Sequence, residues 1–455
     1  MAIKRLLIAN RGEIAVRIIR AAKSMGIHTI QAHSEADADM LAVRQADEAV
    51  CIGPAQAAQS YLNVGAGGAG AKATQADAVH PGYGFMAENA AFVRALAEAG
   101  ITFVGPSADT IDRMGDKVAA RQAAEAAGVP VVPGSKGRLE TVDDAVSVAA
   151  GLGYPVMIKA AAGGGGKGIR IADNEADLRK MAPQAQAEAK AAFGDGGLYL
   201  ERAIQLPRHI EVQIMGDGTD AVHYFERECS MQRRRQKVWE EAGAACLDEA
   251  TRKHLCDTAV SLAKAVNYVG AGTLEYLYDS ATKEFFFIEM NTRIQVEHPV
   301  TEMLTGTDLV QEMIHVAGGG KLRQSQEDIT RSGHAIEVRL NAEDPMMQFL
   351  PFPGQVSSLK LPEGDGIRFD HFLYEGYQVP PFYDSLLGKL IVHGKDRDAA
   401  IALMITALEG LEIGGLKTTK PLHLALAHDP AVRADDFHTQ WLEPWLAAGN
   451  LKPTP

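Results

Sequence analysis

Acidic, amide and cationic side chains alternate along one short segment, at a spacing that would let them act together. An apolar run leads directly into Glu289, Asn291, Arg293 and Glu297. Successive side chains of an extended strand point to opposite faces, so these odd-numbered residues would share one face. Residues 289–297 are therefore predicted to form one continuous catalytic face.

A similar apolar run ends on another acid, Glu275. Together with Glu289 and Asn291, it would supply two carboxylates and an amide oxygen. Mg²⁺ prefers such hard oxygen ligands and often leaves part of its shell to phosphate and water. The three residues are predicted to bind a divalent metal, and the alternative is a pair of surface acids at the ends of two strands.

A glycine-rich loop follows the strand predicted over residues 154–159. Lys159 ends that strand, and the loop Gly163–Gly168 contains a further lysine, Lys167. Glycines let backbone N–H groups close over phosphate oxygens, and lysines add positive charge. The loop differs from the P-loop because no serine or threonine follows Lys167. Phosphate binding is favoured over the alternative, a flexible connector.

Four cations gather at Arg233, Arg234, Arg235 and Lys237, in a chain whose net charge is −13 at pH 7. A chain this acidic lacks the basic stripe of a nucleic-acid-binding protein, so nucleic acid is not an expected partner. For the cluster itself, an anion site is favoured over a plain basic surface.

A second glycine-rich stretch, Gly65–Gly70, matches the dinucleotide pattern G-x-G-x-x-G. That pattern is informative only between the first strand and helix of a βαβ unit, with an acidic residue about 20 positions later. Neither condition holds here. A closely packed helix or loop of small residues is therefore predicted.

Strands and helices alternate at the start of the chain. Strands are predicted over residues 4–9, 27–33, 78–80 and 101–104, and a helix over Ile14–Met25. This alternation predicts a parallel sheet with flanking helices over the first ~110 residues.

The pattern changes further along the chain. An alanine-rich helix is predicted after Lys117, followed by a small α/β segment over residues 131–204. Residues 205–330 alternate strands and helices. After Gly333 the chain is predicted to be dominated by strands, with a final helix over Asp398–Leu408.

Length and composition are those of a globular protein with about three domains, since the chain has 455 residues of which 46% are hydrophobic. The four cysteines lack CxxC spacing, which disfavours a zinc site or disulfide framework and fits reduced thiols in a cytosol. The first residues resemble a strand more than a signal peptide. A membrane-spanning helix needs about 20 consecutive apolar residues, and the sequence contains no such run. A cytoplasmic location without membrane contact is expected.

Several motifs jointly resemble the biotin carboxylase component of biotin-dependent carboxylases, of the acetyl-CoA carboxylase type, within the ATP-grasp superfamily. They span nearly the whole chain: Ile8–Ala15, His80–Phe85, Met114–Lys117, Cys229–Arg234, Ile288–Glu302, Asn341–Pro345 and Pro381–Ser385. The resemblance implies an α/β and α+β protein with the ATP-grasp fold. Its implied parts are an N-terminal Rossmann-like domain (1–114), an ATP-grasp domain (115–330, with a lid at about 131–204) and a mixed β-rich C-terminal domain (331–447).

The resemblance implies ATP- and Mg²⁺-dependent (or Mn²⁺-dependent) carboxylation of biotin by bicarbonate through carboxyphosphate. This would be the first half-reaction of an acyl-CoA carboxylase, as in fatty acid biosynthesis. Because the usual biotin attachment signature is absent, biotin is expected on a separate biotin carboxyl carrier protein, with a carboxyltransferase subunit completing the reaction. A homodimer is also implied, and Arg17 and Arg20 resemble its interface residues.

Site residues are implied position by position. The bicarbonate cradle, the general base and the cation for the biotin anion would be Lys237, Arg293, the Gln295 and Val296 amides, Glu297 and Arg339. The metal ligands would be Glu275, Glu289 and Asn291. The nucleotide contacts would be Lys117, Lys159, Gly164, Gly165, Gly166, Lys167, Gly168, Glu201, Arg202, Ile204, His209, Gln232, Arg235 and Leu277, with Tyr83 at the biotin end. His298 is left open between a site residue and a core histidine.

The chain departs from the family pattern at a few positions. Arg235 stands where histidine or asparagine is usual, and its fixed charge would change the nucleotide contact. Gly243 replaces a usual proline and would loosen its loop, and Ala162 and Phe352 also differ. None of these removes a catalytic group. The final acceptor is left open. The alternatives are an ATP-grasp ligase that activates bicarbonate or another carboxylate for a non-biotin acceptor, and a non-catalytic nucleotide-binding scaffold.

Overall fold

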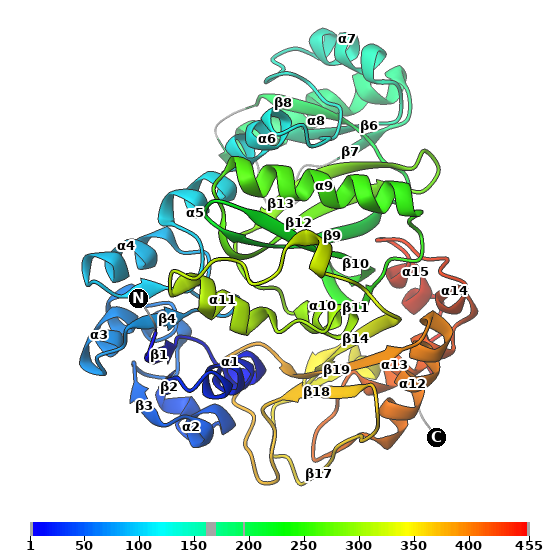
Figure 1. Ribbon diagram of the computed structural model, residues 1–455. Coiled ribbons are helices and arrows are strands. Elements are labelled where there is room, and N and C mark those ends of the chain that lie inside the picture. The colour runs from blue at the N-terminus through cyan, green and yellow to red at the C-terminus, as the bar shows by residue number, and fades with distance from the viewer. Residues whose placement is uncertain (1–2, 161–169, 194–195, 453–455) are drawn as a thin grey trace. The chain divides into compact units, whose positions relative to one another are not determined.

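The computed structural model describes residues 3–160, 170–193 and 196–452 (Figure 1). The chain divides into two compact units, and each unit is built from separate segments of the sequence. The first unit comprises residues 1–129, 208–276 and 289–455, and the second comprises 130–207 and 277–288.

The first part of the chain forms a parallel five-stranded sheet, as the strand and helix alternation predicts. Its order is β3-β2-β1-β4-β5. Its elements are β1 (Arg5–Ile8), α1 (Gly12–Ser24), β2 (His28–His33), α2 (Leu41–Gln45), β3 (Glu48–Cys51), α3 (Val64–Ala73), β4 (Ala78–His80), α4 (Ala90–Glu98), β5 (Thr102–Phe103) and α5 (Ala108–Gly115). Leu6, Leu7 and Ile8 of β1 are fully buried, as expected for a sheet covered on both faces.

The glycine-rich stretch at 65–70 lies in helix α3, so of the two predicted alternatives, a closely packed helix or a loop of small residues, the structure shows the helix. The Asn63 side chain caps this helix by accepting a hydrogen bond from the Ala66 N–H. Gly67 packs so closely that a Cβ there would lie 3.0 Å from the Phe92 ring. The glycines of α3 therefore allow close packing against α4.

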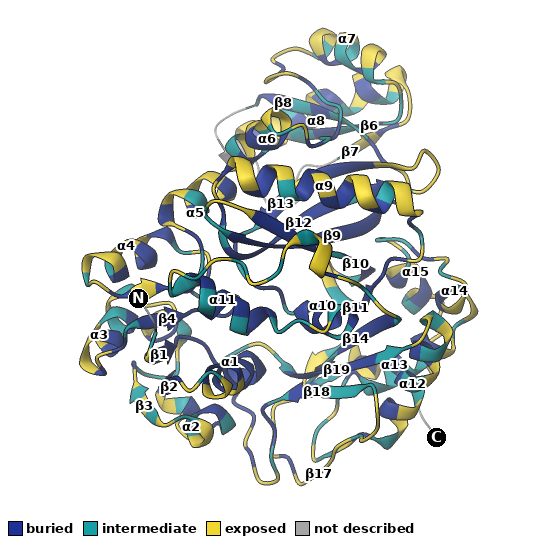
Figure 2. Cartoon of the chain, in the orientation of Figure 1, coloured by how far each residue is buried: buried dark blue, intermediate teal, exposed yellow. Residues whose placement is uncertain are grey.

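An eight-stranded sheet, in the order β13-β12-β9-β10-β11-β14-β19-β18, holds most of the remaining strands. These are β9 (Arg208–Asp217), β10 (Ala221–Arg233), β11 (Gln236–Ala242), β12 (Val269–Asp279), β13 (Glu284–Asn291), β14 (His334–Asn341), β18 (Ile367–His371) and β19 (Leu386–Gly394). Helix α9 (Glu249–Ala265) packs on β9 and β10, and α10 (His298–Thr305) packs on β14 and β19. Strands β9 and β10 are buried over most of their length (Figure 2), so even their polar side chains are withdrawn from water.

The C-terminal region contains more helix than predicted. After α11 (Leu309–Ala317) its elements are β15 (Glu343–Asp344), β16 (Leu350–Pro351), β17 (Ser358–Lys360), α12 (Arg397–Gly410), β20 (Glu412–Gly414), α13 (Lys420–His428), α14 (Pro430–Arg433) and α15 (Leu442–Ala447). The prediction that the helix at Asp398–Leu408 is the last one was wrong. Pro421 and Pro430 lie in the first turns of α13 and α14, where proline needs no N–H partner and starts a helix rather than breaking one.

The second unit is built on a three-stranded antiparallel sheet in the order β7-β6-β8. Its elements are α7 (Val142–Leu152), β6 (Val156–Ala160), β7 (Arg170–Ala172), α8 (Glu175–Phe193) and β8 (Leu198–Arg202), and α6 (Lys117–Ala126) precedes it in the first unit. Ile158 and Leu200 are fully buried between the strands and helices of this unit. Among the described helices, none is long and apolar enough to cross a bilayer.

Close packing of α3 against α4 can be tested with two neighbouring glycines. Gly67→Val should lower the free energy of unfolding by about 1–3 kcal/mol, because its side chain would overpack against Phe92. Gly68→Ala should raise it by about 0.5–1 kcal/mol, because alanine favours helix and no other atom lies near that position. Urea unfolding measures both values, and equal stability of the two variants would contradict this packing.

Candidate active site

The segment that follows β13 is a turn, so the predicted extended face over residues 289–297 was wrong. Strand β13 ends at Asn291, and Glu297 is the residue that precedes helix α10. The turn nevertheless groups the predicted side chains. Arg293 donates from Nη1 to Gln295 Oε1 at 2.8 Å and from Nη2 to Asn291 Oδ1 at 3.3 Å. The shared location is correct, but loop geometry rather than strand alternation produces it.

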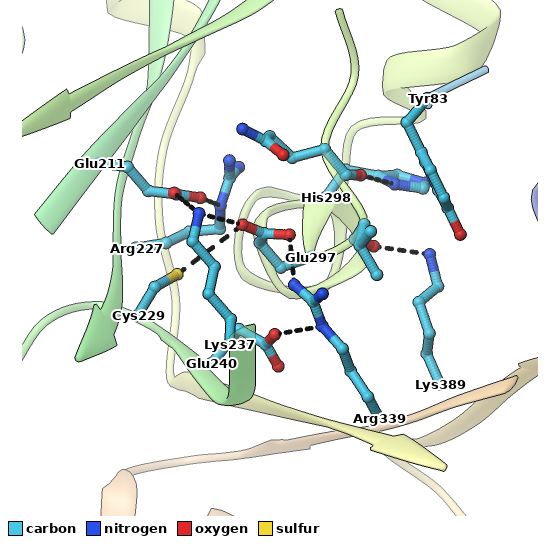
Figure 3. A network of polar contacts seen from close by, with 12 residues as sticks. Tyr83, Glu211, Arg227, Cys229, Lys237, Glu240, Glu297, His298, Arg339 and Lys389 are labelled. Carbon is cyan, nitrogen blue, oxygen red and sulfur yellow. Dashed lines mark hydrogen bonds and ion pairs between the residues drawn. The ribbon is translucent and has the colours of Figure 1, made fainter. Parts of the chain in front are cut away.

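The mostly buried ammonium group of Lys237 joins three carboxylates, two of which, Glu211 and Glu297, are shown in Figure 3. Lys237 Nζ donates to Glu211 at 2.5 Å, to Glu275 at 2.9 Å and to Glu297 Oε1 at 2.7 Å. The acids come from β9, from β12 and from the residue before α10. Arg227 adds a second cation, with Nε 2.6 Å from Glu211 Oε1. The cluster therefore balances buried acids with buried bases.

The other oxygen of Glu297 meets a different cation. Arg339 donates from Nη2 to Glu297 Oε2 at 3.0 Å and from Nε to Glu240 Oε1 at 2.6 Å. Burial alone would raise the pKa of Glu297, but the charge of Lys237, followed by those of Arg339 and Arg227, lowers it below the usual value. Glu297 is therefore an ionised carboxylate at neutral pH, which is the state required of a proton acceptor.

The pKa of the neighbouring Glu240 moves the other way. Burial is the main cause, the charge of Glu297 adds to it, and the pKa of Glu240 rises to about 7 despite its contact with Arg339. The two acids that share Arg339 thus differ in protonation near neutral pH. Neighbouring acids whose pKa values are shifted in opposite directions are typical of catalytic sites.

The predicted metal ligands lie near one another, but their positions within the strands differ from the prediction. Glu275 lies in the middle of β12, which continues to Asp279, so the prediction that a strand ends on this acid was wrong. It is buried, which excludes the alternative of a surface acid, and it accepts a hydrogen bond from Asn291 Nδ2 at 2.9 Å. Burial and then the charge of Glu275 raise the pKa of Glu289. A cation would relieve this repulsion, so the acids fit a divalent metal.

His209 adds a possible ligand beside these acids. Its Nε2 lies 3.3 Å from Glu275 Oε2. Burial alone would lower the pKa of His209, but the charge of Glu275 opposes it and raises the pKa to about 9. Ligand atoms of His209, Glu211 and Glu275 all lie within 4.8 Å of one another, so a metal could compete with Lys237 for these carboxylates.

The four basic residues of the predicted anion cluster are separated by a hairpin turn. Arg234 and Arg235 form the turn between β10 and β11, are exposed, and have φ values of 47° and 66°. Arg233 stacks on the Phe349 ring at 3.7 Å. Only Lys237 reaches the acid cluster. Gln232, next to the turn, donates to the Cys229 carbonyl at 2.9 Å.

The remaining predicted nucleotide contacts lie in several places. Lys117 is exposed at the start of α6, in the first unit. In the second unit Lys159 forms an ion pair with Glu201, and Arg202 pairs with Glu284 at 2.8 Å. Ile204 and Leu277 belong to a small apolar cluster of that unit. Gly164, Gly165, Gly166, Lys167 and Gly168 lie outside the described residues, as does Ala162.

A cavity of about 530 Å³ lies in the first unit beside this network. Its lining includes the cations Lys237 and Arg339, the aromatic rings of Tyr83 and Phe349, and Val296. Tyr83, predicted at the biotin end, therefore shares a cavity with two predicted catalytic residues. The lining also holds the acids Glu13, Glu343 and Asp384, so the cavity is suited to a small polar ligand, with Lys237 and Arg339 on the part of the wall that favours negative charge.

One further expectation is corrected by the structure, and another, the place of Arg17 and Arg20 in a dimer interface, stays a prediction. Gly243 has φ +88°, a conformation closed to proline, so glycine at this position sets the shape of the loop rather than simply loosening it. Arg17 is buried and pairs with Glu302 at 2.8 Å and Asp308 at 2.7 Å. It therefore stabilises the interior of the chain, whereas Arg20 is more than half exposed.

Sequence reasoning missed Glu211, Arg227 and Glu240. Glu211 lies on β9 between two buried apolar neighbours, Ile210 and Val212. The alternation of polar and apolar residues there suggests a strand with one face in water. In fact both faces are buried, and the polar face holds the ion network.

Comparisons with known proteins agree along the whole chain. Three family models match: "Biotin carboxylase, N-terminal domain" at residues 2–111, "Carbamoyl-phosphate synthase L chain, ATP binding domain" at 116–325 and "Biotin carboxylase C-terminal domain" at 337–444. Biotin carboxylase 1 of Bacillus subtilis is 52% identical, and the match covers 98% of this chain and 100% of that protein. Biotin carboxylase of Pseudomonas aeruginosa is 51% identical, with coverage of 97% and 98%.

Solved structures give the same result. The biotin carboxylase–β,γ-ATP complex from Campylobacter jejuni has a TM-score of 0.88 and 49% identity, covering 97% of this chain and 99% of that one. The biotin carboxylase domain of a thermophilic 2-oxoglutarate carboxylase, bound to bicarbonate, has a TM-score of 0.94 and 44% identity, covering 100% of both chains.

The role of Lys237 as the shared counter-charge can be tested by stability. Lys237→Met should lower the free energy of unfolding by about 3–5 kcal/mol, because it removes the cation that three buried carboxylates share. Adding Glu211→Gln to this variant should recover part of the loss. Urea unfolding provides the measurement, with the exposed Lys253→Met as a control that unfolds like the wild type. A Lys237→Met protein as stable as that control would contradict the role.

Proposed function

Because the chain belongs to the biotin carboxylase family, its activity is the ATP-dependent carboxylation of biotin, and we propose that Glu297 is the general base of this reaction. The observation that supports the role is the pair of cations on its two oxygens, which keeps a fully buried carboxylate ionised. A general base must be deprotonated before it can accept a proton, and Glu297 meets that condition at neutral pH.

We propose that Glu297 accepts the proton of bicarbonate. A bicarbonate oxygen then forms a bond to the γ-phosphorus of ATP as the bond to the β-phosphate oxygen breaks, giving carboxyphosphate and ADP. Carboxyphosphate splits into CO₂ and phosphate. Phosphate or a nearby carboxylate removes the ureido N–H proton of biotin, and the ureido nitrogen forms its bond to CO₂. Lys237 and Arg293, with the Gln295 and Val296 amides, would hold bicarbonate.

Arg339 would stabilise the negative charge that develops on the ureido oxygen of biotin. Its position supports this role, because it lines the cavity while Nη2 holds Glu297. Tyr83, on the wall of the same cavity, would contact biotin.

We propose Glu275, Glu289 and Asn291 as the residues that hold Mg²⁺ or Mn²⁺, with His209 and Glu211 close by. When bound, the metal would neutralise phosphate charge and align the γ-phosphoryl group. The nucleotide itself would be held by the residues named from the resemblance: Lys117, Lys159, Gly164–Gly168, Glu201, Arg202, Ile204, His209, Gln232, Arg235 and Leu277.

We also propose the organisation around this activity. The domains would be 1–114, 115–330 and 331–447, with residues 131–204 as a lid. Biotin would arrive on a biotin carboxyl carrier protein, a carboxyltransferase subunit would use the product, and the chain would act as a homodimer in the cytoplasm. Solved relatives include the biotin carboxylase domain of a 2-oxoglutarate carboxylase, the biotin carboxylase subunit of a pyruvate carboxylase and a urea carboxylase, so the final acceptor is a separate question.

Glu297→Gln tests the general base. It keeps the shape of the side chain but cannot take a proton, so the rate of biotin-dependent ADP release should fall by about 10²–10⁴-fold. The exposed Glu363→Gln is the matched control and should retain wild-type turnover. A Glu297→Gln enzyme with normal turnover would exclude the role. Wild-type protein that binds ATP but shows no stimulation by biotin would overturn the activity itself.

The lid proposal has its own test. If residues 131–204 close on nucleotide binding, adding MgATP should slow their cleavage in limited proteolysis by at least several-fold, whereas cleavage elsewhere should change little. Mass spectrometry of the fragments locates the cuts. Unchanged cleavage within 131–204 at saturating MgATP would contradict the lid.

A further inference from the structure

Two buried side chains outside the proposed catalytic set hold the backbone just before Glu297. Lys389 Nζ, on β19, donates to the Val296 carbonyl at 2.6 Å. His298 Nδ1 lies 2.8 Å from the Gln295 carbonyl, and since a carbonyl only accepts, Nδ1 carries the proton. Figure 3 shows both side chains reaching this turn. Two consecutive carbonyls are therefore fixed by buried donors.

Fixing a carbonyl also fixes the amide on the other side of the same peptide. A peptide unit is planar and trans, so its N–H points away from its C=O. His298 thereby orients the Val296 N–H, which belongs to the proposed bicarbonate cradle. Lys389 orients the Glu297 N–H, and with it the backbone that carries the proposed base.

A buried lysine is unusual and needs a balancing charge. Lys389 is fully buried, and its Nζ lies 3.3 Å from Glu13 Oε1. Glu13 in turn accepts a hydrogen bond from the Tyr83 hydroxyl, and the Tyr83 ring lies beneath the ammonium at 5.9 Å. A chain of contacts thus runs from the cavity wall at Tyr83, through Glu13 and Lys389, to the turn at Val296.

Strand register places further charges beside Lys389. Arg339 of β14 lies directly opposite Lys389 of β19, and Glu337 of β14 lies directly opposite Glu240 of β11. Both oxygens of the fully buried Glu337 lack a hydrogen-bond partner among the described residues. Two acids and two bases therefore occupy one patch of the sheet, against which α10 packs.

We propose that Lys389 is a positioning residue for the bicarbonate subsite, which fixes the Val296–Glu297 peptide and connects it to the cavity wall through Glu13 and Tyr83. The inference rests on the proposed role of Glu297. Lys389 does not touch the reacting atoms. Its effect is to hold the proposed base and the adjacent amides around the place where bicarbonate would bind. A small misplacement of these groups would lower the rate of the reaction strongly.

A purely structural lysine predicts a different result. It would affect folding and the amount of active enzyme, and therefore kcat, but not the affinity for one substrate over another. A positioning lysine must change bicarbonate KM selectively, because ATP is held by other residues. The ratio of the two KM changes separates the two roles.

Lys389→Met tests the proposal in steady-state biotin carboxylation by the full chain. We expect bicarbonate KM to rise ~10-fold or more and kcat to fall ~10–100-fold, with ATP KM within about 2-fold of the wild type. Lys389→Arg, which keeps a buried donor and charge, should recover at least part of both losses. The exposed Lys395→Met is the matched control and should behave as the wild type.

Removing Lys389 alone leaves Glu13 without its cation and could impair folding. The double variant Glu13→Gln with Lys389→Met removes both charges and should fold while keeping the raised bicarbonate KM. Bicarbonate KM unchanged in a folded variant, or KM values for bicarbonate and ATP that rise together, would overturn the proposal. Wild-type protein without biotin-dependent turnover would instead overturn the proposed function, so the two failures are distinguishable.

Discussion

Each oxygen of the buried Glu297 carboxylate meets a different cation, and much of the first unit is organised around that balance. Lys237 holds one oxygen and Arg339 the other. Taking a single ion out of water costs several kcal/mol, so neither the acid nor the bases could be buried alone. The further acids around Lys237 and Arg339 follow from the same requirement. Glu211 and Glu275 face the ammonium, and Glu240 faces the guanidinium.

Among the described residues, not every buried acid near Arg339 has a cation to balance its charge. Glu240 and Glu337 lie opposite each other on neighbouring strands, and both are fully buried. Burial, with the nearby acids, raises the pKa of both residues, to about 7 for Glu240. Two adjacent carboxyl groups cannot both ionise cheaply in such a place, so the pair retains a proton near neutral pH. A partly protonated pair takes up less of the Arg339 charge, which leaves more of it for Glu297 and for the anion that Arg339 is proposed to stabilise.

Sequence patterns predicted the parts of the structure that depend on local periodicity. The parallel sheet over the first part of the chain and helix α6 after Lys117 follow from apolar spacing and alanine content, whereas for residues 65–70 the small-residue content predicted close packing but left helix and loop open. The partners of Lys237 could not be found this way. Glu211 is 26 residues away and Glu297 is 60 residues away, and only the tertiary fold, through strand order for Glu211 and the turn before α10 for Glu297, brings them together. Periodicity describes one strand at a time, whereas an ion network depends on which strands are neighbours.

The strand pattern also failed at residues 292–297, where the chemistry is proposed. Extending β13 through Glu297 would have placed that acid on a straight edge, with no helix behind it. Instead the chain turns after Asn291 and enters α10, so Glu297 lies at the N-terminal end of a helix, where partial positive charge favours a carboxylate. The same end would favour a bound anion beside it. A turn needs outside support to hold one geometry, and Lys389 and His298 supply it by fixing successive carbonyls. Departure from regular structure at this point is therefore what lets one short segment present the proposed base, the proposed amide donors and an arginine together.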